Sequence, residues 1–68
     1  MTDAVYKVVE ITGTSPVNVT TAIENAVAKA AETLRQLDWF EVISVRGYIS
    51  DGKVAHYQVT LKVGFKLE

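Results

Sequence analysis

The dipeptide Asp51-Gly52 restricts the fold more than any other feature of this sequence, because it separates two long strand-like segments. Residues 39–50 and 53–67 are both rich in β-branched and aromatic side chains, which are typical of strands. An Asp-Gly pair between two such segments favours a type I′ turn, since both central residues of that turn need positive φ. The sequence therefore predicts an antiparallel hairpin in which Ser50 faces Lys53.

The turn also predicts which residues face one another across the hairpin. Without a bulge, the further pairs are Arg46 with Tyr57, Val45 with Gln58, Val42 with Leu61, Phe40 with Val63 and Trp39 with Gly64. Side chains alternate between the two faces of a strand, so one face is expected to pack on a helix through Phe40, Val42, Val59, Leu61 and Val63. The other face is expected to carry Trp39, Ile43, Val45, Ile49, Val54, Gln58 and Thr60. That second face is too apolar to remain in water, so we expect another subunit to cover it.

The first half of the chain predicts one strand and one helix. Residues 4–12 are rich in Val, Ile and Tyr and indicate a strand that ends at Gly13, after which Pro16 interrupts the pattern. Apolar residues then recur at helical spacing: Val19, Ala22, Ile23, Ala26, Val27, Ala30, Leu34 and Leu37. Asn18 is the expected N-cap of this amphipathic helix, because its side chain can accept a bond from a first-turn N–H.

The order of these elements determines the expected topology. A helix that returns the chain leaves the first two strands parallel, and the hairpin makes the third strand antiparallel to both. Antiparallel pairing throughout then requires the third strand to lie in the middle. We expect an α+β fold, a βαββ subunit with strand order 1-3-2 packed on one long helix, forming a single domain over residues 1–68.

Size and composition indicate that the chain associates with itself. It has 68 residues, no cysteine and one histidine, so disulfides, thiolate metal sites and imidazole clusters are not available to stabilise it. A chain this short buries only about 60% of the surface that its unfolded form exposes. Because 49% of its residues are hydrophobic, we expect a homo-oligomer.

Charge and hydropathy narrow the range of partners and locations. The net charge of −1 comes from interspersed acids and bases, without the basic surface that nucleic acid requires. No apolar run approaches the roughly 20 residues of a membrane span, and residues 1–3 lack the beginning of a signal peptide. We expect no nucleic-acid or membrane partner and a cytoplasmic location. The sequence also lacks a Ser/His/Asp or Cys/His set, which argues against a self-contained hydrolase.

Trp39 and Gln58 are the leading candidates for ligand contacts. Trp39 is either a core or interface anchor or a stacking surface for a planar ligand that fills the space beside Gly64. Gln58 either bonds to backbone across an interface or offers a donor and an acceptor to a ligand edge. In the predicted register Gln58 faces Val45, six residues from Trp39 or about 20 Å along the sheet. A ligand that touches both residues would therefore need two subunits or a bulge.

Two further polar residues have less specific interpretations. Arg46 either stacks on Tyr57 with its guanidinium in solvent or binds a phosphate. His56 lies on the predicted face of Gln58 and fits an interface or surface position better than a catalytic one, because no acid is fixed beside it. We assign no acid/base residue and no metal ligand from the sequence.

Four blocks resemble the dodecins, small flavin-binding proteins, in their order and spacing. They are VVEITGTSP at residues 8–16, LDWFEV at 37–42, Arg46-Gly47, and YQVTLKVGFKLE at 57–68. The resemblance covers essentially the whole chain and is greatest to the bacterial branch. It implies a βαββ subunit, a hollow homododecamer, and flavins bound between subunits as stacked pairs between symmetry-related Trp rings.

The resemblance also implies roles for four residues. Trp39 matches the stacking Trp of the family, and Gln58 matches the Gln that hydrogen-bonds the isoalloxazine ring. Arg46 matches a basic position that helps to hold the FMN phosphate in bacterial members. Lys66 stands where many bacterial members carry Arg, so it offers a point charge in place of a bidentate grip. Some bacterial members also bind coenzyme A.

The expected function is storage and sequestration of FMN, riboflavin or related flavins by a protein that is not an enzyme. One alternative is a flavin-dependent electron-transfer enzyme, although a ring covered on both faces leaves no access for a second substrate. The other is a purely structural oligomer in which Trp39 and Gln58 only pack. A visible absorption spectrum distinguishes the structural oligomer from the two flavoproteins, and a reductase assay distinguishes those from each other.

Overall fold

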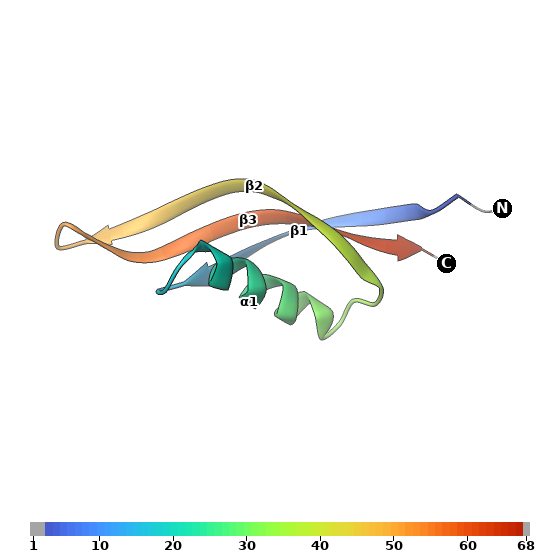
Figure 1. Cartoon of the computed structure of the whole chain (residues 1–68), viewed down its shortest axis with the longest axis horizontal. Coiled ribbons are helices and arrows are strands. Elements are labelled where there is room, and N and C mark those ends of the chain that lie inside the picture. The colour runs from blue at the N-terminus through green and yellow to red at the C-terminus, as the bar shows by residue number, and fades with distance from the viewer. Residues whose placement is uncertain (1–2, 68) are drawn as a thin grey trace.

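The computed structural model describes residues 3–67 and has one helix packed on a three-stranded sheet (Figure 1). In chain order the elements are β1 (Val5–Ser15), α1 (Val19–Ala31), β2 (Leu37–Ser50) and β3 (Lys53–Leu67). The sheet order is β1-β3-β2, and β3 pairs antiparallel with both neighbours. The predicted βαββ subunit with strand order 1-3-2 is therefore confirmed. Residues 1, 2 and 68 of the predicted domain lie outside the described residues.

The hairpin between β2 and β3 turns where the sequence predicts it to turn. Asp51 and Gly52 have φ angles of 53° and 72°, the positive values that a type I′ turn requires at both central positions. Ser50 pairs with Lys53 across this turn, as predicted. The hairpin extends well past the helix, so the described chain is elongated, with extents of 56 × 20 × 14 Å (Figure 1).

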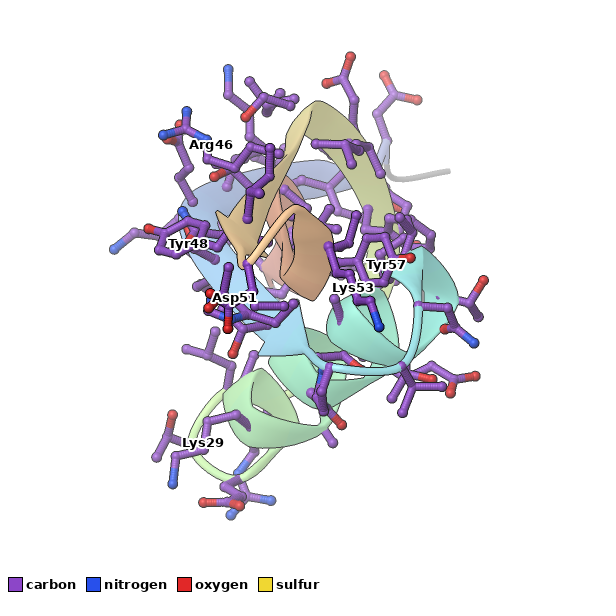
Figure 2. All side chains as sticks on the ribbon, turned by 90° about the vertical axis from the view of Figure 1, so that its left-hand side faces the viewer. Lys29, Arg46, Tyr48, Asp51, Lys53 and Tyr57 are labelled. Carbon is purple, nitrogen blue, oxygen red and sulfur yellow. The ribbon has the colours of Figure 1, made fainter. Side chains whose placement is uncertain are left out.

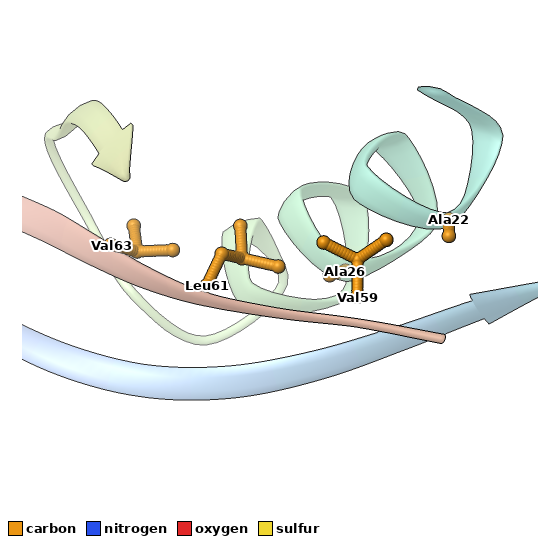
Figure 3. Packing of buried hydrophobic residues seen from close by; sticks show 5 residues of the cluster. All are labelled: Ala22, Ala26, Val59, Leu61 and Val63. Atoms are coloured by element: carbon orange, nitrogen blue, oxygen red, sulfur yellow. The ribbon is translucent and has the colours of Figure 1, made fainter. Parts of the chain in front are cut away.

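The hydrophobic core lies between α1 and the β1 and β3 strands, where small helix residues face large strand residues. It consists of Ala22, Ala26, Val59, Leu61 and Val63, all of them nearly inaccessible to solvent (Figure 3). Gly13 of β1 permits this close packing, because a Cβ there would lie 2.8 Å from the Cβ of Ala26 and would also collide with the Ala22 carbonyl. The 13 residues of α1 span only about 20 Å, so the helix covers part of the sheet and leaves the rest without a layer.

Two element boundaries differ from the sequence-based expectation. The first strand does not end at Gly13 but continues to Ser15, paired with β3 throughout. The helix begins as predicted, with the Asn18 Oδ1 accepting a bond from the Thr21 N–H at 2.7 Å. It ends at Ala31, so Leu34 and Leu37 do not belong to its apolar stripe. Leu37 instead opens β2, after Gln36 reverses the chain with φ of 60°.

Three bulges change the register of the hairpin. Ala55 is an extra residue in β3, and Ile43 and Asp38 are extra residues in β2. The first two bulges lie on opposite strands and cancel, so the predicted pairs of Trp39 with Gly64, Phe40 with Val63, and Val42 with Leu61 are correct. Between them the register is shifted by one residue. Arg46 faces Gln58 rather than Tyr57, and Val45 faces Val59 rather than Gln58.

The shifted register also changes which side chains share a face. Val45 lies on the side of the sheet that carries α1, because it pairs with Val59. Five of the exposed apolar residues accordingly lie on the helix side, and three of them, Val45, Ile49 and Val54, were predicted on the face of Trp39 and Gln58. We call the five residues the helix-side strip, and they are Phe40, Val42, Val45, Ile49 and Val54, with exposed fractions of 40% to 78%. The expectation of an unburied apolar face is confirmed, whereas its predicted location is wrong.

The opposite side of the sheet, which we call the outer face, is mostly polar. From β1 it carries Tyr6, Val8, Glu10, Thr12 and Thr14; from β2, Trp39, Glu41, Ser44, Arg46 and Tyr48; and from β3, His56, Gln58, Thr60, Lys62, Gly64 and Lys66. Figure 2 shows Arg46 and Tyr48 on the far side of the ribbon from α1, whereas Tyr57 lies toward the helix. All four sequence-predicted ligand residues, Trp39, Arg46, Gln58 and Lys66, lie on this outer face.

Candidate functional site

At one end of the outer face, the indole of Trp39 lies across Gly64 of the neighbouring strand. A Cβ built on Gly64 would lie 2.7 Å from the indole Nε1 and closer still to Cε2 and Cζ2. The sequence predicts an empty slot beside the indole for a planar ligand, and this is wrong, because the indole itself fills the space above Gly64. Trp39 nevertheless stays 39% exposed, so part of the indole remains accessible to a stacking partner.

Tyr6 holds this indole from the side. The two rings meet edge to face, with centroids 5.9 Å apart and an interplanar angle of 62°. The Tyr6 hydroxyl donates a hydrogen bond of 2.5 Å to Oδ2 of Asp38, the bulge residue directly before Trp39. This bond is the main cause that raises the pKa of Tyr6, with burial and the negative charge of Asp38 adding to it. Tyr6 thus contacts both the indole of Trp39 and the side chain of the residue directly before it.

Sequence analysis does not single out Tyr6, because nothing local determines the register of β1. The pairing of Tyr6 with Lys66 depends on a crossover through α1, whereas the hairpin has a turn that indicates its register. Alternation along β1 from a known partner would have placed Tyr6 on the face of Trp39.

Lys66 lies two residues beyond Gly64 on the same face, so it belongs to the same end of the sheet. Tyr6, Asp38, Trp39, Gly64 and Lys66 form what we call the stacking end.

The other two predicted residues lie together further along the outer face. Gln58 and Arg46 are direct cross-strand partners, and Thr14 of β1 flanks Gln58 on its other side. The amide of Gln58 therefore stands in a row with a guanidinium and a hydroxyl, a set that offers several donors and an acceptor to the edge of a ligand. We call Thr14, Gln58 and Arg46 the polar end. Tyr48 and His56 continue the same face, with ring centroids 4.5 Å apart and a tilt of 37°.

The stacking end and the polar end are too far apart to hold one ring within a single chain. Six residues of β3 separate Gly64 from Gln58, which corresponds to about 20 Å along an extended strand. The intervening outer face contains polar rows, including hydroxyls of Thr12 and Thr60 that lie 3.0 Å apart. The sequence-based inference left two subunits or a bulge as the ways to bring Trp39 and Gln58 to one ring. The bulges in this hairpin leave six residues of β3 between Gly64 and Gln58, so two subunits are the remaining way.

Within residues 3–67, the recess beside Trp39 is too small to enclose a ligand of cofactor size. The recess is lined by Val27, Leu37, Asp38, Trp39, Phe40 and Val63 and has a volume of about 130 Å³. Pockets that enclose ligands of cofactor size usually measure about 300 to 1,000 Å³.

Among residues 3–67, no group of three or more His, Asp or Glu side chains is arranged to hold a metal ion. In the same range, no helix is both long and apolar enough to cross a bilayer.

The protein is a small α+β protein with one helix on a three-stranded antiparallel sheet of order β1-β3-β2. Its outer face carries the partly exposed aromatic ring of Trp39. The sequence model of the Dodecin family matches residues 5–68. The chain therefore belongs to the dodecin family. This finding confirms the family to which the sequence blocks point.

Individual relatives agree with this assignment. The chain is 55% identical to the dodecin of Thermus thermophilus over 64 aligned residues. The alignment covers 94% of this chain and 93% of that protein. The dodecin structure from Streptomyces coelicolor superposes with a TM-score of 0.93 at 59% identity, covering 100% of this chain and 97% of the other. Dodecin from Streptomyces davaonensis gives the same TM-score of 0.93 at 52% identity, with 98% of both chains covered.

Proposed function

We propose that this protein binds flavins, FMN foremost and riboflavin as well, and holds them between subunits of a homododecamer. The observation that carries the proposal is the position of Trp39, whose indole lies against Gly64 while the residue stays 39% exposed. A flat aromatic surface supported from behind favours a flat aromatic ligand, because offset stacking contributes about 0.5 to 1.5 kcal/mol per ring pair beyond area burial. Membership of the dodecin family supports a flavin as that ligand.

In this proposal, each ligand contacts two copies of the chain. The roughly 20 Å between the stacking end and the polar end means that Trp39 of one copy and Gln58 of another meet the same ring. Gln58 supplies an amide donor and acceptor to the polar edge of the ring, and its partner Arg46 holds a phosphate. Lys66 adds a second positive charge beside Trp39.

Assembly has its own structural basis in the helix-side strip. Five apolar side chains that stay 40% to 78% exposed in one chain are unfavourable in water and become buried when copies pack together. The twelve-subunit number comes from the resemblance to dodecins. Because α1 packs mainly on β1 and β3, the strip stays exposed in one chain and is available to a neighbouring subunit.

Storage is favoured over catalysis by the stacking geometry. A ring covered by an indole on one face and by the second flavin of the pair on the other is close to a good electron donor and shielded from a second substrate, which favours quenching of the excited flavin over turnover. Coenzyme A, which some bacterial members bind, is a further ligand that this chain is proposed to accept. We assign the protein to the cytoplasm.

Titration of free FMN with purified protein tests the proposal directly. Binding is expected to quench flavin fluorescence and to saturate near one flavin per subunit, because each ring uses one Trp39 and one Gln58. A visible absorption band should accompany the purified protein. Absence of binding would favour a purely structural oligomer. Steady-state transfer of electrons from an added reductant to an added acceptor through the loaded protein would favour the electron-transfer enzyme instead.

A further inference from the structure

Tyr6, Asp38 and Trp39 form a connected group whose geometry is that of a redox relay. The Tyr6 hydroxyl donates to the Asp38 carboxylate at 2.5 Å, within the range of short charge-assisted O–H···O bonds. The centroid of the same phenol ring lies 5.9 Å from that of the Trp39 indole. One side chain is thus bonded to a fixed proton acceptor and packed on a neighbour that can be oxidised.

We propose that Tyr6 and Asp38 return an oxidised Trp39 to its reduced state by proton-coupled electron transfer. When Trp39 has lost one electron, Tyr6 transfers one electron to the indole and its hydroxyl proton to the Asp38 carboxylate. The products are neutral Trp39, a neutral tyrosyl radical at Tyr6 and a protonated Asp38. The tyrosyl radical is discharged when one electron comes back from the original electron acceptor and the proton returns from Asp38.

The carboxylate makes this transfer favourable, because a phenol that loses its proton together with an electron avoids forming a phenol radical cation. Asp38 is held for this role by the bulge at the start of β2, which turns its side chain toward Tyr6. A general base within hydrogen-bond distance typically accelerates such proton transfers by about 10² to 10⁴.

The other two tyrosines of the 68-residue chain are not placed for the same task. Tyr48 is a cross-strand partner of His56 near the hairpin turn, and their rings are 4.5 Å apart. Tyr57 lies on the helix side of the sheet, opposite Gly47. Trp39 is the single tryptophan, so an oxidised indole in this protein has one adjacent phenol in its own chain.

The biological oxidant in this proposal is a photoexcited flavin, so in that respect it rests on the proposed function. The chain's part in the event is to take the oxidising equivalent away from the stacking ring. Trp39 is thereby spared the irreversible oxidation that would destroy the platform. The relay itself depends only on three side chains and can be tested without any flavin.

The test is pulse radiolysis of the flavin-free assembled protein with azide radicals, which oxidise indoles in preference to phenols. Absorption of the tryptophan radical is expected to decay as tyrosyl absorption grows, at a rate independent of protein concentration and slower in D₂O. Tyr6→Phe keeps the ring contact and should abolish tyrosyl growth, whereas Tyr48→Phe should leave it unchanged. Asp38→Asn should slow the growth by about 100-fold.

Three results would overturn the relay: tyrosyl growth that persists in Tyr6→Phe, an unchanged rate in Asp38→Asn, or no tyrosyl signal in the parent protein. Circular dichroism and native mass spectrometry of each variant show whether fold and assembly are intact. Because no flavin is present, failure of the relay leaves flavin binding untouched. Conversely, a protein that fails to bind FMN can still show the transfer from Tyr6 to Trp39. The two proposals can therefore fail independently of each other.

Discussion

The indole of Trp39 occupies the space in which a side chain on Gly64 would otherwise stand. Any Cβ at Gly64 would meet Nε1, Cε2 and Cζ2 of the ring, so the two residues form a single packed unit across β2 and β3. Gly64 is thus required for steric reasons, because any side chain there would displace the indole.

Gly64→Ala is therefore expected to push the indole off the sheet. The variant should shift the tryptophan emission spectrum and weaken FMN binding by at least tenfold, since the stacking surface is displaced. Gly47→Ala is the matched control, because a Cβ there meets nothing closer than 3.5 Å. Equal tryptophan spectra and equal affinities for the two variants would contradict the packed unit.

Gln58→Leu is expected to leave assembly intact and to weaken FMN binding by about 1 to 3 kcal/mol, the usual cost of leaving a buried polar partner unpaired. Gln58 lies between Thr14 and Arg46 on the outer face, so its removal leaves the stacking end unchanged. Fluorescence titration of FMN measures the loss. An unchanged affinity would return Gln58 to a packing role.

The bond between Tyr6 and Asp38 predicts a particular dependence on pH. It raises the pKa of Tyr6 above the usual 10.0, because the neutral phenol is the form that donates to the carboxylate. The stabilisation from this bond is therefore complete below about pH 10 and is lost as the pH rises through the raised pKa of Tyr6.

Asp38→Asn should lower the pKa of Tyr6, and ultraviolet titration of phenolate absorption measures the change. Tyr6→Phe identifies the Tyr6 component, because that component disappears from the titration curve. If the parent protein and Asp38→Asn give superimposable curves, the bond does not hold Tyr6 in its neutral form.

The helix-side strip predicts where assembly is most sensitive to charge. Ile49 is 78% exposed in one chain, so Ile49→Lys should favour smaller oligomers if this strip is buried between subunits. Val17→Lys is the control, since Val17 is 65% exposed but lies before α1 and outside the strip. Native mass spectrometry measures the oligomeric state of both variants. A full assembly of the Ile49 variant, or equal disruption by the two, would place the interface elsewhere.

Topology was predictable because strong local signals determine it. The Asp51-Gly52 turn, the Asn18 cap and the change of period between strand and helix each involve residues whose chemistry favours one structure. Those signals were sufficient for strand order 1-3-2 and for the pairs at both ends of the hairpin.

Other features depend on tertiary contacts and carry no local signal. Ala55 and Ile43 are not residues that favour a bulge, yet together they move Val45 to the helix side and bring Arg46 opposite Gln58. Leu37 continues the helical spacing but starts a strand, because Gln36 adopts a positive φ that sequence rules reserve mainly for Gly and Asn. Gln58 was therefore predicted on the correct face with the wrong cross-strand partner, whereas Arg46, predicted opposite Tyr57, lies on the other face from the one that its predicted pairing implies.

The measurement that tests the central claim most directly is FMN titration of Trp39→Ala, with the oligomeric state recorded on the same sample. The account predicts an intact assembly whose FMN affinity falls far more than that of Gln58→Leu, and whose remaining bound flavin regains much of its fluorescence. A full assembly that binds FMN as tightly as the parent protein and quenches it equally would contradict the account and leave Trp39 as an interface anchor.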